Sequence, residues 1–148
     1  MTISIIRIAN RSGAVVAPDW LPRAERVHRQ LRPDLEVDYV SQMQGIFREG
    51  GEMLVAVVDG EVAGVAVFRS FANTHAGRRF YVDDLVTDDT RRSTGVGHAM
   101  LAWLENEAGT RGCRGIDLES GTQRTRAHRF YFREGYFVTS FSFRKALG

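Results

Sequence analysis

The segment that decides the fold is Asp88-Asp-Thr-Arg-Arg-Ser-Thr-Gly-Val-Gly97, which lies between a predicted strand and a predicted helix. Gly95 and Gly97 let the backbone approach a ligand closely, because neither carries a Cβ atom. The start of the following helix presents unpaired N–H groups at its positive dipole end. Together with the charges of Arg91 and Arg92, these features favour binding of a phosphate or pyrophosphate. Two glycines alone indicate only a tight turn and close helix packing.

Two common nucleotide-binding loops do not match this segment. A P-loop needs a lysine and a hydroxyl residue after its second glycine, whereas His98 and Ala99 follow here. A dinucleotide fingerprint needs a third glycine in register, and Met100 occupies that position.

The elements before the loop are predicted from hydrophobic periodicity and turn residues. Asp59-Gly60 predicts a tight hairpin turn, since its glycine tolerates a positive φ. The apolar runs on either side of this turn are nearly continuous, which is typical of strands covered on both faces. The expected elements are a strand at 3–8, helices at 20–31 and 38–48, strands at 53–58 and 62–68, a polar loop at 72–78 and a strand at 79–87.

After the loop, apolar spacing predicts a helix that begins after Gly95, a strand at 115–119 and a helix at 125–134. Partial alternation at 136–144 predicts one or two final strands. The order is therefore β-α-α-β-β-β-α-β-α-β(-β), an α/β (α+β) fold with a mixed central sheet and helices on both faces. The length of 148 residues predicts a single domain over 1–148.

Composition excludes several classes of protein. The chain is 43% hydrophobic and 26% charged with a formal net charge of +2, which fits neither a disordered protein nor a nucleic-acid binder. One cysteine, Cys113, excludes an internal disulfide and a multi-cysteine zinc site. The four histidines show no metal-ligand spacing, so we expect no metal. No apolar run approaches the roughly 20 residues of a membrane span, and no export signal is recognisable, so we expect a cytoplasmic protein.

Two motifs together resemble a known family. Arg92-Ser-Thr-Gly-Val-Gly97 resembles the acetyl-CoA pyrophosphate loop of the GNAT superfamily of N-acetyltransferases. Downstream, Ala127-His-Arg-Phe-Tyr-Phe-Arg-Glu-Gly-Tyr-Phe137 resembles the second hallmark of that superfamily, and the expected element order matches its fold. The resemblance is strong from about residue 52 to 138. It departs at Arg124, where many members carry an asparagine.

The resemblance implies transfer of an acetyl group from acetyl-CoA to an amine, with acetyl-CoA as co-substrate. It implies that the pantetheine contacts the backbone of Leu85, Val86 and Thr87. It also implies that the pyrophosphate is held by Arg92, Ser93, Thr94, Gly95, Val96, Gly97 and His98.

Three side chains are the candidates for the chemistry that the resemblance implies. Tyr131 stands at the family's tyrosine position and is expected to protonate the leaving thiolate, although an aromatic beside two phenylalanines is by type a core residue. Asp83 and Asp84 compete for the base and the substrate anchor; by resemblance to the spermidine/spermine-type members, Asp83 is the base through water and Asp84 the anchor. Successive strand residues face opposite sides unless a bulge intervenes, and pairing of either acid with an arginine such as Arg79 is the structural alternative.

The expected acceptor is a primary amine of a cationic small molecule, drawn by the acidic pair and by Asp34, Glu36 and Asp38. Two alternatives remain open: an aminoacyl-tRNA- or protein-directed acetyltransferase, and a non-catalytic acyl-CoA sensing module. The basic face of the last helix, formed by Arg124, Arg126, Arg129 and Arg133, is typical of a solvated surface; contact with the CoA 3′-phosphate or with RNA is the alternative. The aromatic C-terminal strands are candidates for pairing in a homodimer.

Overall fold

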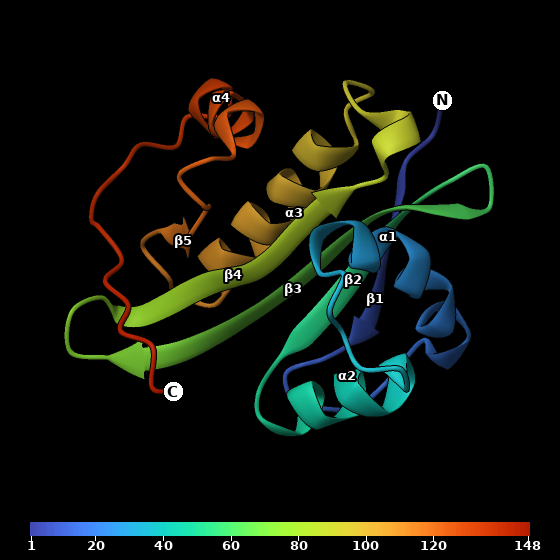
Figure 1. The fold of residues 1–148 in the computed structure, drawn as a ribbon, viewed down its shortest axis with the longest axis horizontal. Coiled ribbons are helices and arrows are strands. Elements are labelled where there is room, and N and C mark those ends of the chain that lie inside the picture. Colours follow the sequence, from blue (N-terminus) through green and yellow to red (C-terminus); the bar gives the residue numbers. More distant parts are fainter. The chain divides into compact units, whose positions relative to one another are not determined.

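The computed structural model describes residues 1–148, which form two compact units, Met1–Asp117 and Leu118–Gly148 (Figure 1). The helices and strands, in chain order, are β1 (Ser4–Ala9), α1 (Glu25–Leu31), α2 (Tyr39–Arg48), β2 (Glu52–Val58), β3 (Glu61–Asn73), β4 (Gly77–Thr87), α3 (Val96–Thr110), β5 (Ile116–Leu118) and α4 (Thr125–Arg133). Short 3₁₀ turns occupy Pro18–Trp20, Pro22–Ala24 and Asp89–Arg91. This order confirms the predicted fold class as far as the last helix.

The sheet has the strand order β1-β2-β3-β4-β5, and the first four strands pair antiparallel in sequence. The β2–β3 connection is the predicted tight turn. Asp59 and Gly60 both have positive φ, 52° and 77°, as a primed turn requires. The turn fixes the pairing of the residues next to it, and a β-bulge between Ala56 and Val57 shifts the register of the remaining pairs.

Helices cover both faces of the sheet, as predicted. Every residue of β2 is buried. Its alternate residues Met53, Val55 and Val57 belong to a hydrophobic cluster shared with α1 and α2. The residues between them point to the opposite face, where α3 packs (Figure 1).

Close packing at Gly64 places the beginning of α3 against the sheet. A Cβ atom at Gly64 would lie 2.7 Å from Met100 Cε and 2.9 Å from Val96 Cγ1. Val96 is the first residue of α3 and is buried. The glycine in β3 therefore lets the first turn of α3 approach the strand, and this positions the loop that precedes the helix.

A buried ion-pair cluster joins β2 to the end of α3. Arg111 donates to both oxygens of Glu52, at 2.6 and 2.8 Å. Arg111 also contacts Glu107 at 3.1 Å, and Arg7 of β1 contacts Glu107 at 3.1 Å. The Glu52 and Arg111 side chains are only 1% and 3% exposed, so each charge depends on the other for stabilisation.

The structure corrects three element boundaries. The expected helix at 20–31 is regular only from Glu25, because Pro22 cannot donate a backbone hydrogen bond and two 3₁₀ turns precede it. The expected loop at 72–78 is shorter, since β3 continues to Asn73 and β4 begins at Gly77. The helix expected at 125–134 ends at Arg133, followed by Gly135 with a φ of 91°.

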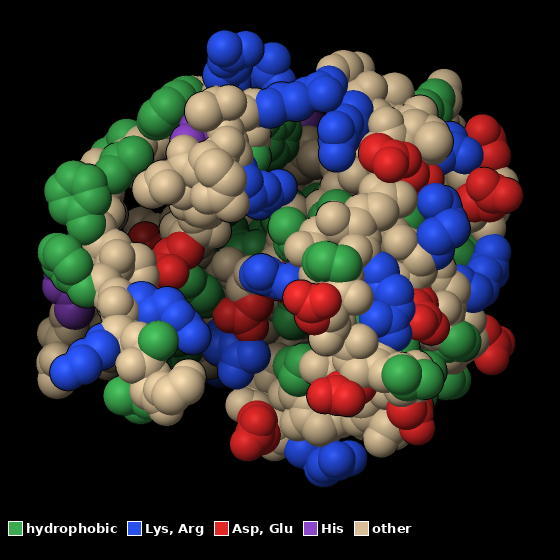
Figure 2. Space-filling view, viewed as in Figure 1, with side chains coloured by type: hydrophobic (Ala, Val, Ile, Leu, Met, Phe, Trp, Pro, Cys, Tyr) green, Lys and Arg blue, Asp and Glu red, His purple; other side chains and the backbone are tan.

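The strands predicted at 136–144 are wrong for this structure. Residues 136–148 contain no strand. Partial alternation favours an extended backbone, but a strand also needs a neighbour with which to exchange hydrogen bonds. The apolar side chains of this segment are exposed instead (Figure 2), including Phe137, Phe141 and Phe143 at 78%, 82% and 94%. None of the helices has the length and apolar character needed to cross a membrane.

Candidate functional site

The glycine loop connects β4 to α3, as predicted, and is open to solvent. Residues 92–95 are exposed, whereas Val96 is buried beneath them. Ser93 and Gly95 both have positive φ, 63° and 89°, so the chain turns sharply twice before the helix. The N-cap residue of α3 is Gly95, which supplies no side-chain cap. The N-cap residue of this 15-residue helix therefore offers no side-chain acceptor to the N–H groups of the first turn.

The surroundings of Gly95 fit a bound phosphate group. A Cβ atom placed there would have only Ile3 Cδ1 nearby, at 4.0 Å, so protein packing does not explain the glycine. Its positive φ does. The structure brings the predicted pyrophosphate-binding residues together in one loop and helix start: Arg92, Ser93, Thr94, Gly95, Val96, Gly97 and His98.

The end of β4 leads into this loop. Its residues pair through the backbone with the middle of β3: Leu85 with Ala66, Val86 with Val65 and Thr87 with Gly64. Leu85 is buried, and Val86 packs against the cluster beneath α1 and α2. The proposed pantetheine contacts of Leu85, Val86 and Thr87 therefore lie on a rigid central strand.

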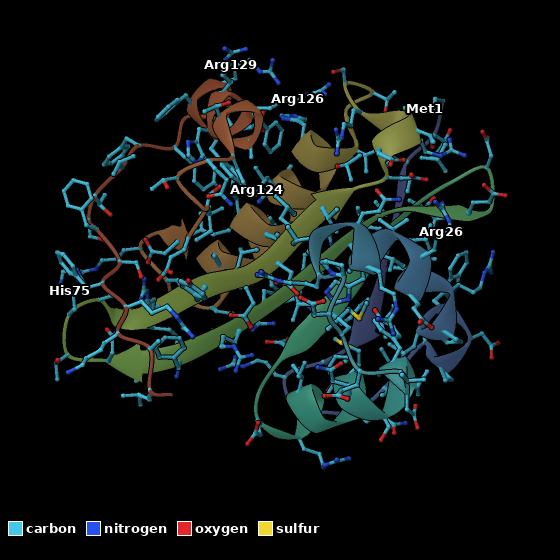
Figure 3. All side chains as sticks on the ribbon, viewed as in Figure 1. Met1, Arg26, His75, Arg124, Arg126 and Arg129 are labelled. Atoms are coloured by element: carbon cyan, nitrogen blue, oxygen red, sulfur yellow. The ribbon has the colours of Figure 1, made fainter.

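Asp88 anchors the start of the loop to α1. Its carboxylate accepts hydrogen bonds from Arg26, at 2.8 Å (Figure 3), and from Gln30, at 3.2 Å. The side-chain oxygen of Gln30 in turn accepts a hydrogen bond from the Asp89 N–H, at 2.9 Å. Thr90 N–H donates to Asp88 as well, at 3.3 Å. The hydrogen bond from Arg26 holds the pKa of the buried Asp88 well below its usual range. The carboxylate is therefore a fixed structural anion.

Asp83 occupies a β-bulge. Opposite β3, Val82 pairs with Phe68 and Asp84 pairs with Val67, so Asp83 is an extra residue in β4. Its carboxylate accepts from Arg69 Nε at 2.8 Å and Nη2 at 2.6 Å, and its side chain is 27% exposed. The expected arginine alternative is thus present, but the partner is Arg69.

Asp84 is held by two donors from the α1 segment. His28 Nε2 lies 2.7 Å from one carboxylate oxygen, and Arg32 Nε and Nη2 lie 2.8 and 2.7 Å from the other. Burial raises the pKa of Asp84, but the hydrogen bonds from His28 and Arg32 outweigh it and hold the pKa below its ordinary value. Arg79, in contrast, pairs with Asp117 at 3.1 Å.

Sequence reasoning missed His28, Arg32 and Arg69 as partners of the acidic pair. His28 and Arg32 stand four residues apart on one helix face, and His28 follows Val27 on the buried side of that helix. A histidine on an apolar helix face was the available signal. Its partner Asp84 is 56 residues away, so local spacing did not reveal the pair.

Tyr131 lies on α4, in the second unit. It is 9% exposed, and its ring contacts those of Phe130 and Tyr136 at centroid distances of 5.4 and 5.9 Å. Burial raises the pKa of its hydroxyl, which Arg124 partly counteracts. Arg126 and Arg129 project outward from α4 (Figure 3) and are exposed, in agreement with a solvated face.

Two sequence relatives are named N-acetyltransferases. The chain is 37% identical over 94 residues to the aminoalkylphosphonate N-acetyltransferase of Salmonella typhimurium (strain LT2); the match covers 63% of this chain and 61% of that relative. The chain is also 29% identical over 119 residues to the uncharacterized N-acetyltransferase YhdJ of Bacillus subtilis (strain 168), covering 78% and 84% of the two chains.

Solved structures share the fold. The aminoglycoside N-acetyltransferase AAC(6')-Iy, solved in complex with CoA, superimposes with a TM-score of 0.82 at 14% identity over 99% of this chain and 95% of its own. At that identity the likeness concerns the fold alone. The model of the Acetyltransferase (GNAT) family, however, matches residues 17–136, which include the glycine loop, the acidic pair and the second motif from Ala127 to Tyr136. The chain therefore belongs to the GNAT family of acetyltransferases.

Proposed function

We propose that the chain is an enzyme that transfers the acetyl group of acetyl-CoA to a primary amine of a small molecule. The observation that carries this proposal is the start of α3 at the exposed, positive-φ Gly95, which supplies no side-chain cap of its own. Backbone N–H groups at a helix start suit a pyrophosphate, and the family model covers this segment. When bound, acetyl-CoA supplies the activated thioester; the residues of this chain bind it, orient it and move protons.

Tyr131 is the proposed general acid. The amine replaces the thiolate at the acetyl carbon, and the departing sulfur then needs a proton. Because burial raises the pKa of Tyr131, its hydroxyl keeps its proton at neutral pH and has one to donate. Tyr131→Phe should lower turnover roughly 10²–10⁴-fold while cofactor affinity stays nearly unchanged.

The proposed division of labour in β4 assigns proton removal to Asp83 through a water molecule and substrate anchoring to Asp84. Asp83 is the more exposed carboxylate, at 27% against 13% for Asp84, and has a single arginine partner. Asp84 receives donors at both oxygens. A carboxylate held ionised in this way is a poor proton acceptor and a better fixed charge.

The charge of the acceptor divides the proposal into two candidates. A cationic amine was expected because of the acidic pair, yet Arg69 and Arg32 already lie within 2.8 Å of those carboxylates. Both arginines are partly exposed, at 31% and 50%. An amine that also carries an oxyanion would find positive charge here, and the relative from Salmonella is named for aminoalkylphosphonates. This second candidate therefore stands beside the cationic one.

A thiol-release assay with acetyl-CoA tests the proposal. The acceptor panel contains polyamines, amino sugars, amino acids, aminoalkylphosphonates, a lysine peptide and aminoacyl-tRNA. Release of CoA with small amines, lost in Tyr131→Phe, supports the proposed enzyme, and the preferred acceptor decides between the two candidates. Release only with the peptide or tRNA favours a macromolecular acceptor. CoA binding without release from any acceptor favours the non-catalytic sensing module.

A further inference from the structure

We propose that α1 positions the two parts of the acetyl-transfer site through separate side chains, and that His28 is the positioning residue for Asp84. The inference rests on the proposed function, because it assigns Asp84 to the amine side and the glycine loop to acetyl-CoA. His28 and Gln30 stand two residues apart on α1, yet they contact opposite ends of the segment 84–89.

His28 joins two helices to the central strand. Its side chain is 1% exposed. Nε2 lies 2.7 Å from Asp84 Oδ2 in β4, and Nδ1 lies 2.8 Å from the hydroxyl of Tyr39, the first residue of α2. The two rings meet edge to face at a centroid distance of 5.6 Å. Both nitrogens of this buried imidazole therefore have a partner, and its orientation is fixed from both sides.

The hydrogen bonds link Tyr39, His28 and Asp84 in series, and the proton positions follow from the two outer groups. An ionised carboxylate only accepts hydrogen bonds, so His28 Nε2 must donate to Asp84. Burial raises the pKa of Tyr39, so its hydroxyl keeps its proton. In a neutral imidazole, Nδ1 then accepts a hydrogen bond from the Tyr39 hydroxyl. In this neutral form Tyr39 favours the tautomer that keeps a donor on Asp84, and a charged imidazole also donates to Asp84 through Nε2.

His28 and Arg32 keep Asp84 an anion, and the other charged groups near it are paired with one another. Arg32 donates to its other oxygen and reaches the Asp83 carbonyl at 3.2 Å, at the bulge. From β3, Arg69 neutralises Asp83, so the adjacent carboxylate does not add a net repulsion. Beside Tyr39, Glu25 and Arg29 pair with each other at 2.7 Å. His28 is the donor in this group that is buried and cannot turn away to solvent.

Gln30 acts on the cofactor side. Its amide donates to Asp88 and accepts from the Asp89 N–H, beside the Arg26–Asp88 ion pair. These contacts hold the residues where β4 enters the glycine loop. Gln30 touches neither Asp83 nor Asp84 in any of these hydrogen bonds, and His28 touches neither Asp88 nor the loop. A substitution at each position therefore provides the matched control for the other.

The experiment compares His28→Leu, His28→Gln and Gln30→Met. The Michaelis constants for acetyl-CoA and for the best amine of the acceptor panel are measured, and NMR follows titration of the Asp84 carboxyl carbon. His28→Leu should lower kcat/KM for the amine roughly tenfold or more, because it removes a hydrogen bond to a charged group, and should leave the KM for acetyl-CoA unchanged. The Asp84 pKa should rise. His28→Gln, whose amide supplies a donor, should restore much of both properties.

Gln30→Met should give the opposite pattern: a raised KM and a weaker calorimetric affinity for acetyl-CoA, with Asp84 titrating as in the wild type. Equal effects of His28→Leu and Gln30→Met on both substrates would overturn the proposal, because they would indicate general loosening of α1. Should His28→Leu fail to fold, the wild-type titration decides: an Asp84 that titrates at the ordinary value for aspartate overturns it. A wild-type protein that acetylates nothing refutes the proposed function, while the titrations still report on His28.

Discussion

Replacing Gly64 by alanine tests whether close packing at this residue positions α3. The added methyl group would lie 2.9 Å from Val96 Cγ1, about 0.5 Å inside the 3.4 Å at which ordinary contact begins. Its other close neighbours, Met100 Cε and Sδ at 2.7 and 2.9 Å, end a flexible side chain and are able to move aside. Val96 is β-branched and sits in the first turn of the helix, so the strain falls on the helix start.

The expected loss of stability is about 1–2 kcal/mol. Overpacking of a core by one methyl group costs about 1–3 kcal/mol, and removing a glycine from the unfolded chain returns about 0.5–1 kcal/mol. Urea unfolding measures the difference as a lower midpoint at constant slope. Calorimetry on the same protein should show weaker CoA binding, since Val96 adjoins the glycine loop.

Two further variants make this prediction sharp. Gly45→Ala in the middle of α2 is the control, because its Cβ atom would meet only Arg48 Nη2 at an ordinary 3.7 Å. It should stabilise the protein by up to about 1 kcal/mol through helix propensity. Adding Val96→Ala to Gly64→Ala should relieve the overlap, although it also opens space of its own. A Gly64→Ala protein as stable as the wild type would refute the packing argument.

Three other substitutions test the remaining features. Arg111→Met should destabilise the fold by about 3–5 kcal/mol, because it leaves Glu52 charged and buried; adding Glu52→Gln should recover part of this, and a loss below 1 kcal/mol would contradict the argument. Asp88→Asn should lower stability at pH 7. The pKa of Asp88 is lower in the folded than in the unfolded state, so its ionised form stabilises the fold above the unfolded pKa, and this stabilisation is lost as pH falls toward the folded pKa. The difference in unfolding free energy between Asp88→Asn and the wild type should therefore shrink in acid; a constant difference would contradict the argument. Gly95→Val should abolish calorimetric CoA binding, whereas unaltered binding would remove the loop from the cofactor site.

Local sequence signals predicted those parts of the fold that depend on neighbouring residues. The hairpin at Asp59-Gly60 followed from the conformational preference of one turn, and the strands beside it from continuous apolar runs. The glycine loop followed from the spacing of Gly95 and Gly97 before an amphipathic helix. Each of these features is determined within about ten residues, where spacing and chemistry can be read together.

Pairings between distant residues were not readable in the same way. The partners of Asp84 lie 52 and 56 residues earlier in the chain, and their selection depends on how α1 docks on β4. The sequence indicated only that Asp83 and Asp84 face opposite sides of the strand unless a bulge intervenes; it did not predict the bulge itself. The prediction of strands at 136–144 failed because alternation is a local signal. A strand also needs a neighbouring strand, and the alternation does not indicate which one.

The Glu52–Arg111 pair has a consequence for how this sequence can change over generations. Loss of either side chain alone leaves the other charge buried without its main partner: Glu52 keeps only Arg7, at 4.0 Å, and Arg111 keeps only Glu107, at 3.1 Å. Exchange of both for apolar side chains costs less than loss of one. A lineage that exchanges the pair must therefore pass through a damaged intermediate or make both changes nearly at once. Descendants of this chain should keep both residues or neither, so substitutions at the two positions should be correlated.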